Sequence, residues 1–164
     1  MHICPRCETP LSNFEVTQGY KTVKDISVFV KFELEKAATK LQLQTDEKIY
    51  ALAWTTTAWT LPGNVLLAVG AALDYVLVKV EGETGLFVVA CERLNETMAT
   101  KKFHIIGKSF KGSKLVGLTY KPVFPYFAQW PKAFRVVAAA FVSTQEGTGI
   151  VHIAPAFGED DYQV

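Results

Sequence analysis

The sequence predicts a mainly β fold, either a closed β-barrel or a mixed β-rich arrangement, with a few short helices. Composition favours strands, because 18 Val, 15 Thr and 7 Ile make β-branched residues abundant among the 164 residues. The pattern agrees, since apolar residues recur in short runs that alternate with polar residues or end at turn signals. Several such strands with little helix between them are typical of barrels and related β folds.

Seven segments have the pattern of strands. They are residues 26–33, 48–54, 75–80, 85–90, 103–110, 135–142 and 149–154. The third and fourth flank residues 81–84 and predict a hairpin. Residues 92–100 have the best helix composition in the chain, whereas Pro122, Pro125 and Pro131 predict a loop.

Charge and composition exclude several classes of protein. Seventeen Lys and Arg balance sixteen Asp and Glu, so neither a polybasic arm nor an acidic tail is expected. An apolar content of 49% supports a sizeable core. The longest apolar stretches, such as residues 136–142, are far shorter than the ~18 residues that a membrane span needs. With no signal-peptide pattern at the N-terminus, we expect a cytoplasmic protein without a membrane partner.

Two of the three cysteines lie close together near the N-terminus. Cys4 and Cys7 are separated by two residues, which is half of a four-ligand zinc knuckle. His2 is a candidate third ligand, but four good ligands are not visible. Cys91 follows an apolar strand and is expected to pack as a small hydrophobe. The odd number of cysteines indicates reduced thiols rather than a disulfide framework.

The first dense cluster is W-T-T-T-A-W-T-L-P-G-N, residues 54–64. Three consecutive threonines after a strand place hydroxyl groups on alternating faces. A hydroxyl both donates and accepts hydrogen bonds, so such a cluster suits a bound water or a substrate hydroxyl. The alternative interpretation is that threonine is simply a good strand former.

The second dense cluster is G-T-G-I-V-H-I-A-P-A-F-G-E-D-D-Y, residues 147–162. A predicted strand delivers His152 to a loop that ends in Glu159, Asp160 and Asp161. A carboxylate pairs with an ammonium group or acts as a base. Alternatively, the three acids form a solvated face and the histidine is structural.

A third group consists of lysines around one predicted strand and its loop. Lysines so placed suit phosphate binding, and they equally suit an exposed sheet edge, where they prevent aggregation. They are Lys101, Lys102, Lys108, Lys111 and Lys114.

Together, the two dense clusters resemble the two signatures of the editing (CP1) domain of isoleucyl-tRNA synthetases, which belong to class I of the aminoacyl-tRNA synthetases. Residues 24–32 and 117–124 resemble further segments of the same domain, so the resemblance covers nearly the whole chain. The valyl and leucyl relatives carry an Arg-Pro pair after the threonines, where this chain has Thr57 and Ala58. Ala58 also departs from the family's usual proline, which leaves the loop less rigid without removing a functional group.

The resemblance implies a closed β-barrel that hydrolyses valine from misacylated tRNA(Ile). Asp161 would hold the α-ammonium group of the substrate, while Thr55, Thr56 and Thr57 would contact the terminal ribose and position the water. Asp161, Thr55 and Thr57 form the implied catalytic set. His152 would line the valine pocket, with general base as its alternative role. The implied substrate-binding residues are Trp54, Thr56, Trp59, Thr60, Asn64 and His152.

The resemblance also implies how the chain is organised. Residues 1–22 would form a partial zinc knuckle and connecting segment, and residues 23–164 the editing domain, as a fragment of a larger synthetase that does not itself activate an amino acid. Editing would need no cofactor, although a structural zinc in the full-length enzyme would use Cys4 and Cys7 as a half site. The implied partners are the 3′ end of tRNA(Ile) carrying valine and the remainder of the synthetase, with the chain itself monomeric.

Two alternatives compete with this hypothesis. One is a sister editing domain that acts on another misacylated tRNA. The other is a tRNA-binding or zinc-scaffold module without turnover of its own.

Overall fold

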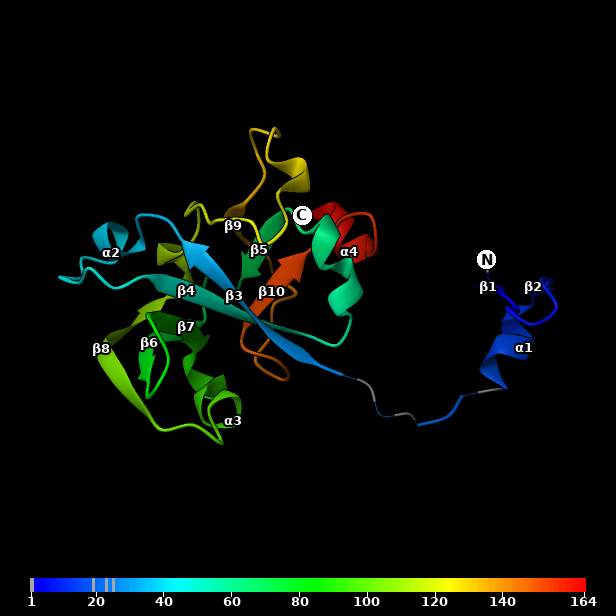
Figure 1. Ribbon diagram of the computed structural model, residues 1–164, viewed down its shortest axis with the longest axis horizontal. Coiled ribbons are helices and arrows are strands. Elements are labelled where there is room, and N and C mark those ends of the chain that lie inside the picture. Colours follow the sequence, from blue (N-terminus) through cyan, green and yellow to red (C-terminus); the bar gives the residue numbers. More distant parts are fainter. Residues whose placement is uncertain (1, 19, 23, 25) are drawn as a thin grey trace.

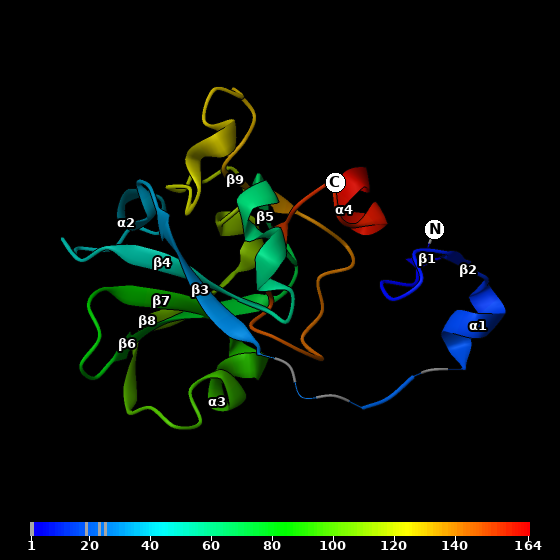
Figure 2. The ribbon, with the colours of Figure 1, turned by 45° about the vertical axis from the view of Figure 1, so that its right-hand side comes forward.

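The structure is a computed structural model that describes residues 2–18, 20–22, 24 and 26–164. Its N-terminal unit consists of β1 (His2–Ile3), β2 (Pro10–Leu11) and α1 (Asn13–Thr17). The two strands pair antiparallel, and Ser12 and Glu15 form a capping box at the start of the helix. Figures 1 and 2 both show this unit apart from the β-rich body. The domain boundary predicted between residues 22 and 23 involves residue 23, which lies outside the described residues.

The body is built on a five-stranded sheet with the order β3-β4-β7-β6-β8. Neighbouring strands run antiparallel, except that β4 and β7 are parallel. The predicted hairpin is confirmed, because β6 and β7 are adjacent antiparallel strands. The strands are β3 (Val28–Leu34), β4 (Ile49–Thr55), β6 (Asp74–Val80), β7 (Leu86–Ala90) and β8 (Phe103–Lys111).

A second sheet has three strands in the order β10-β5-β9. β5 (Leu66–Val69) pairs antiparallel with β10 (Ile150–Ile153) and parallel with β9 (Arg135–Ala138). β5 was not among the predicted strands, because a short run of apolar residues at every position lacks the alternation that marks a half-buried strand. β9 is shorter than the predicted strand over residues 135–142.

Neither of the larger sheets closes on itself. In the part of the chain that the structure describes, each has two ends in its hydrogen-bonded order, so a mainly β fold is confirmed but the predicted closed barrel is wrong. Only isolated bridges span the gap between the sheets, where Tyr120 meets Leu34 of β3 and Thr119 meets Arg135 of β9. A barrel requires a continuous ladder around its circumference, and these single bridges do not supply one.

The two sheets share one hydrophobic core. Phe32 of β3, Leu67 of β5 and Tyr75 of β6 are fully buried in it, together with Tyr120 and Ile150. The opposite face of the five-stranded sheet is covered by the helical segment η2 (Cys91–Arg93) and α3 (Leu94–Thr97), which realises the predicted helix in shortened form. Figure 1 shows α3 at the lower side of this sheet.

The remaining helical turns lie in the connections. They are α2 (Ala37–Lys40), η1 (Ala58–Gly63), η3 (Gly112–Lys114), η4 (Pro125–Phe127) and α4 (Glu159–Gln163). The three acids that the sequence places in a loop instead form the first turn of α4, where carboxylates favour the positive end of a helix. Among the described residues, no helix has the length and apolar character needed to cross a bilayer.

Candidate functional site

Hydrogen bonds from Thr60 and Asn64 join the two sequence clusters, and the one from Thr60 reaches His152. The Thr60 hydroxyl, in η1, lies 3.2 Å from Nε2 of His152 in β10. The sequence brings them together because β4 ends at Thr55 and the chain turns through η1 into β5, which pairs with β10. The threonine-rich turn and the histidine strand therefore form one continuous polar region.

The threonine turn is held by its own hydroxyl groups. The hydroxyls of Thr55 and Thr57 are 3.2 Å apart, and the Thr57 amide donates to the Thr55 hydroxyl at 3.0 Å. The Thr60 hydroxyl donates to the Thr57 carbonyl at 2.9 Å. Thr56 points to solvent on the exposed side of the turn. Three of the four threonines thus fix the turn.

These contacts favour one tautomer of His152. When the Thr60 hydroxyl donates to the Thr57 carbonyl, its oxygen is left to accept from Nε2 of His152. That arrangement corresponds to a neutral ring with its proton on Nε2. Nδ1 is buried and has no hydrogen-bond partner among the residues that the structure describes. In this conformation the basic nitrogen of His152 is closed to water.

Burial also keeps His152 uncharged. Only 8% of the residue is exposed, and the loss of hydration lowers the pKa of the ring below its usual value. The Asp161 carboxylate opposes this shift, but its effect on the pKa is the smaller of the two. The imidazole is accordingly neutral at pH 7.

Asp161 connects α4 to the end of β10. Its Oδ2 accepts a hydrogen bond of 2.8 Å from the amide of Ala154, immediately beyond the strand. In the described part of the chain, the structure gives Oδ1 no hydrogen-bond donor. Its neighbours Glu159 and Asp160 are exposed. Of the three acids, Asp161 alone is tied into the polar region, with one oxygen left to accept from a cation.

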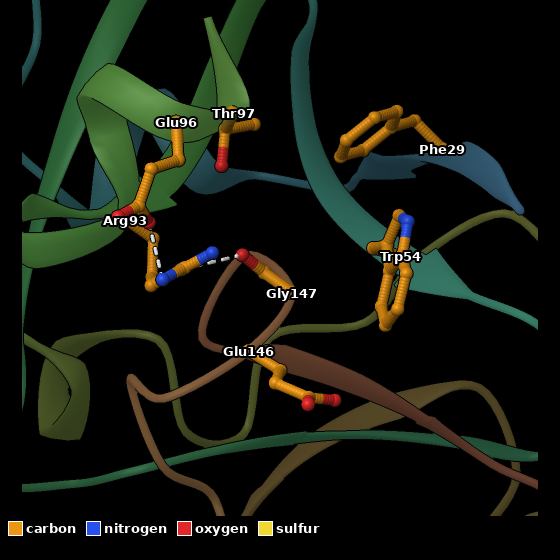
Figure 3. Close-up of a pocket in the computed structure, with 7 residues that line it drawn as sticks. All are labelled: Phe29, Trp54, Arg93, Glu96, Thr97, Glu146 and Gly147. Atoms are coloured by element: carbon orange, nitrogen blue, oxygen red, sulfur yellow. Dashed lines mark hydrogen bonds and ion pairs between the residues drawn. The ribbon is translucent and has the colours of Figure 1, made fainter.

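Trp54 lies on the other side of β4 from Thr55, since successive side chains of a strand face opposite ways. Figure 3 shows Trp54 beside its cross-strand partner Phe29 on one side of a cavity of about 250 Å³, with Arg93, Glu96 and Thr97 on the other side. Arg93 also fixes the glycine-rich loop, because its Nε donates to the Gly147 carbonyl at 3.0 Å. The structure therefore separates Trp54 from Thr60 and His152.

Trp59 and Asn64 have contrasting surroundings. Trp59 is 68% exposed, and its ring meets the Phe157 ring edge-on with centroids 5.1 Å apart. Asn64 is buried, where its side-chain amide donates to the Leu66 carbonyl at 2.9 Å and its oxygen accepts from the Tyr120 hydroxyl at 2.7 Å. Both ends of the Asn64 side chain are therefore engaged within the protein.

A scan against profiles of known protein families finds no match. Individual proteins, however, are similar in sequence over nearly the whole chain. An isoleucine–tRNA ligase of Bacillus thuringiensis (strain Al Hakam) is 47% identical over 161 residues, which are 98% of this chain and 14% of that protein. One of Clostridium tetani (strain Massachusetts / E88) is 45% identical over 158 residues, 96% of this chain and 14% of the relative. The chain belongs to the isoleucine–tRNA ligase family. It spans only 14% of the length of these relatives.

The fold of this isoleucine–tRNA ligase segment matches solved CP1 domains of leucine enzymes. The crystal structure of GlLeuRS-CP1 superposes with a TM-score of 0.70 at 23% identity, covering 84% of this chain and 58% of that one. The editing domain of the Plasmodium falciparum cytosolic leucyl-tRNA synthetase gives a TM-score of 0.65 at 15% identity, covering 83% and 63%. The chain therefore has the CP1 editing-domain fold.

The cysteine pair of this family member lies in the N-terminal unit. The Cys4 amide donates to the Thr9 carbonyl at 2.9 Å, which closes the turn that brings the two cysteines together. Hydrogen bonds from Thr9 and Cys4 lower the pKa of the Cys7 thiol, which favours the thiolate that a metal would bind. Two thiols fit half of a structural zinc site, and no group of three or more potential ligands occurs within the described residues.

Several supporting residues could not be found from the sequence. Tyr75 donates to the Gly149 carbonyl at 2.6 Å, so buried tyrosines act at both ends of β10, Tyr75 directly and Tyr120 through Asn64. A tyrosine in an apolar strand has no local pattern that distinguishes such a hydroxyl from a core ring. The role of Arg93 could not be predicted either, because its partner Gly147 is 54 residues away in the sequence.

Proposed function

We propose that the chain is an editing module that hydrolyses the ester joining valine to the 3′ end of tRNA(Ile). Membership of the isoleucine–tRNA ligase family and the CP1 fold support this assignment. The observation that carries it is the hydrogen bond between Thr60 and His152, because it joins the two signatures into one region that Asp161 borders. The neutral imidazole and the single free carboxylate oxygen suit an aminoacyl ester, which presents an ammonium group beside a carbonyl.

Such an activity corrects errors that arise because a binding pocket discriminates poorly between amino acids that differ by one methylene. A pocket for isoleucine favours it over valine by only about 1–3 kcal/mol per missing methylene, a limit of which isoleucine enzymes are themselves the standard example. A second site that admits valine and excludes isoleucine removes the error. The substrate would be valine already attached to the tRNA.

The ammonium group of the substrate is assigned to Asp161. With Oδ2 engaged by Ala154, Oδ1 remains to accept from the cation, and a charged hydrogen bond of this kind fixes the adjacent carbonyl. Thr55 and Thr57 then hold the attacking water and the terminal ribose. Water adds to the carbonyl carbon, the ester C–O bond breaks, and the ribose oxygen leaves with a proton.

His152 is assigned to specificity rather than to proton transfer. Its Nε2 is bonded to the Thr60 hydroxyl and its Nδ1 is buried, so neither nitrogen is open to a substrate water in this conformation. A rigid imidazole ring is instead a suitable wall against the extra methylene of isoleucine. Trp59 extends the wall from η1. Trp54 is given no substrate contact in this arrangement, because it lines the cavity on the other side of β4 (Figure 3).

The test is the variant Asp161→Asn. An asparagine oxygen still accepts from the Ala154 amide, so the loop is retained while the charge opposite the ammonium group is lost. Hydrogen bonds to charged groups contribute about 1.5–3 kcal/mol, so kcat/KM for release of valine from valyl-tRNA(Ile) should fall roughly 10- to 150-fold. Asp160→Asn is the matched control, because Asp160 is an exposed carboxylate in the same helix. It should leave the rate unchanged.

The substrate comparison uses isoleucyl-tRNA(Ile), which should be spared. Equal loss of both amino acids would refute the assigned specificity. Full activity in folded Asp161→Asn would remove Asp161 from the mechanism. No release of valine by the folded chain at high concentration would favour a binding module without turnover.

A further inference from the structure

A proline-rich loop beside the site exposes an unusual set of aromatic rings. Residues 121–134 contain η4, and their exposed rings include Tyr126 and Trp130, which are 64% and 53% exposed. Phe124 stacks parallel to Tyr126 with centroids 6.1 Å apart, and Phe127 packs against Trp130 at 4.7 Å. The rings are therefore held in pairs, and Phe124, Tyr126 and Trp130 are exposed whereas Phe127 also packs against the shared hydrophobic core.

This loop is continuous with the candidate site. Trp130 and Phe127 line a cavity of about 400 Å³ together with Pro62 of η1 and Phe157 of the loop that follows β10. Both of those segments carry site residues, since η1 contains Trp59 and Thr60 and the loop leads to Asp161. Gly63 makes the junction possible, because a Cβ there would lie 2.7 Å from the Phe157 ring. The aromatic loop therefore borders both segments that carry site residues.

The charge of this part of the sequence suits a polyanion. Residues 121–134 contain two lysines and no Asp or Glu, and Lys121 pairs with Glu33. Lys132 lies two residues from Trp130 and has no ion-pair partner among the described residues. Open rings bordered by lysine match the needs of single-stranded RNA, whose bases stack on aromatic faces while its phosphates meet cations.

We propose that Trp130, with Phe157 and the neighbouring loop rings, stacks the unpaired nucleotides that precede the terminal adenosine of the tRNA. This rests on the proposed function, which requires an RNA 3′ end to reach Asp161. A protein segment is the competing occupant. The absence of acids along the loop and its continuity with the site favour RNA, because a protein partner would not need either feature.

The test measures RNA binding without chemistry. A short single-stranded RNA that ends in CCA, labelled at its 5′ end and carrying no amino acid, is titrated with the 164-residue chain while fluorescence anisotropy is followed. Trp130→Ala should raise Kd at least about fivefold, because one stacked base contributes on the order of 1–3 kcal/mol. Trp130→Phe should restore most of the affinity. Phe14→Ala, an exposed ring in α1, is the matched control and should bind like the parent.

Deacylation separates the two proposals. Trp130→Ala should raise KM for valyl-tRNA(Ile) with little change in kcat, because stacking holds the ground state and the transition state alike. If the parent chain releases no valine but RNA binding still depends on Trp130, the editing function fails and the stacking surface stands. Unchanged Kd and KM in folded Trp130→Ala would overturn the stacking surface and leave a protein contact as its use. Equal weakening by Phe14→Ala would also overturn it.

Discussion

The hydrogen bond between Tyr120 and Asn64 provides a direct test of how the site is supported. Tyr120→Phe removes only the hydroxyl that donates to the Asn64 oxygen at 2.7 Å, within a core where Tyr120 is 2% exposed. The ring keeps its edge contacts with Phe32 and Phe134. The Asn64 oxygen is left buried without its donor, while the Asn64 amide still donates to Leu66.

The magnitude follows from that geometry. A buried acceptor left unsatisfied destabilises a protein by about 1–3 kcal/mol. For a chain of this size, each kcal/mol lowers Tm by roughly 2–4 °C, so Tm should fall by about 2–12 °C. Because Asn64 also reaches the Ile153 carbonyl beside His152, the deacylation rate should fall together with stability.

Thermal unfolding followed by circular dichroism checks this expectation. Tyr50→Phe is the control, because Tyr50 stacks on Phe87 and its hydroxyl has no hydrogen bond within the described residues. It should change the free energy of unfolding by no more than about 0.5 kcal/mol. Equal effects of the two substitutions, or no effect of Tyr120→Phe, would refute the view that this hydroxyl braces the site.

Two further predictions concern His152 and Gly149. Burial lowers the pKa of folded His152 below that of the unfolded chain, so its contribution to stability should be full above about pH 6.5 and be lost as pH falls toward the folded pKa. Urea unfolding of the parent and of His152→Gln at several pH values measures this. The same dependence of the free energy of unfolding on pH in both proteins would contradict the prediction. Gly149→Ala should lower stability by on the order of 3 kcal/mol, because φ is +76° and a Cβ would lie 2.5 Å from that of Ala90. Gly82→Ala shares the positive φ with no neighbour within 4 Å, so a loss as large as that of Gly149→Ala would exclude the clash as the cause.

Local patterns in the sequence were sufficient for most of the strands. The hairpin of β6 and β7 and the edge strand β8 follow from alternation and turn residues alone. β5 could not be recognised, because its burial on both faces erases the period on which recognition depends. The closed barrel was wrong because closure depends on hydrogen bonds near Tyr120 that no local pattern encodes.

The composition of the candidate site was visible in the sequence, but its internal roles were not. The two signatures do meet, through Thr60 and His152. Asn64 was expected to contact substrate, and the structure shows both ends of its side chain bonded within the protein. Trp54 faces a cavity on the other side of β4. The side of β4 on which Trp54 lies and the distant partner that Asn64 bonds determine where these side chains point. Neither can be deduced from the identity of the residue. The substrate contacts themselves remain predictions.

The strand order has a consequence for synthesis of the chain on the ribosome. The five-stranded sheet uses residues 28–111 and is complete in sequence when β8 emerges. β5 is the central strand of the second sheet, yet its partners begin only at Arg135 and Ile150. A nascent chain therefore holds β5 with two unpaired edges until β9 has been made, and with one unpaired edge until β10 follows. The polar region between Thr60 and His152 assembles last, so a truncated product can carry the larger sheet but not the site.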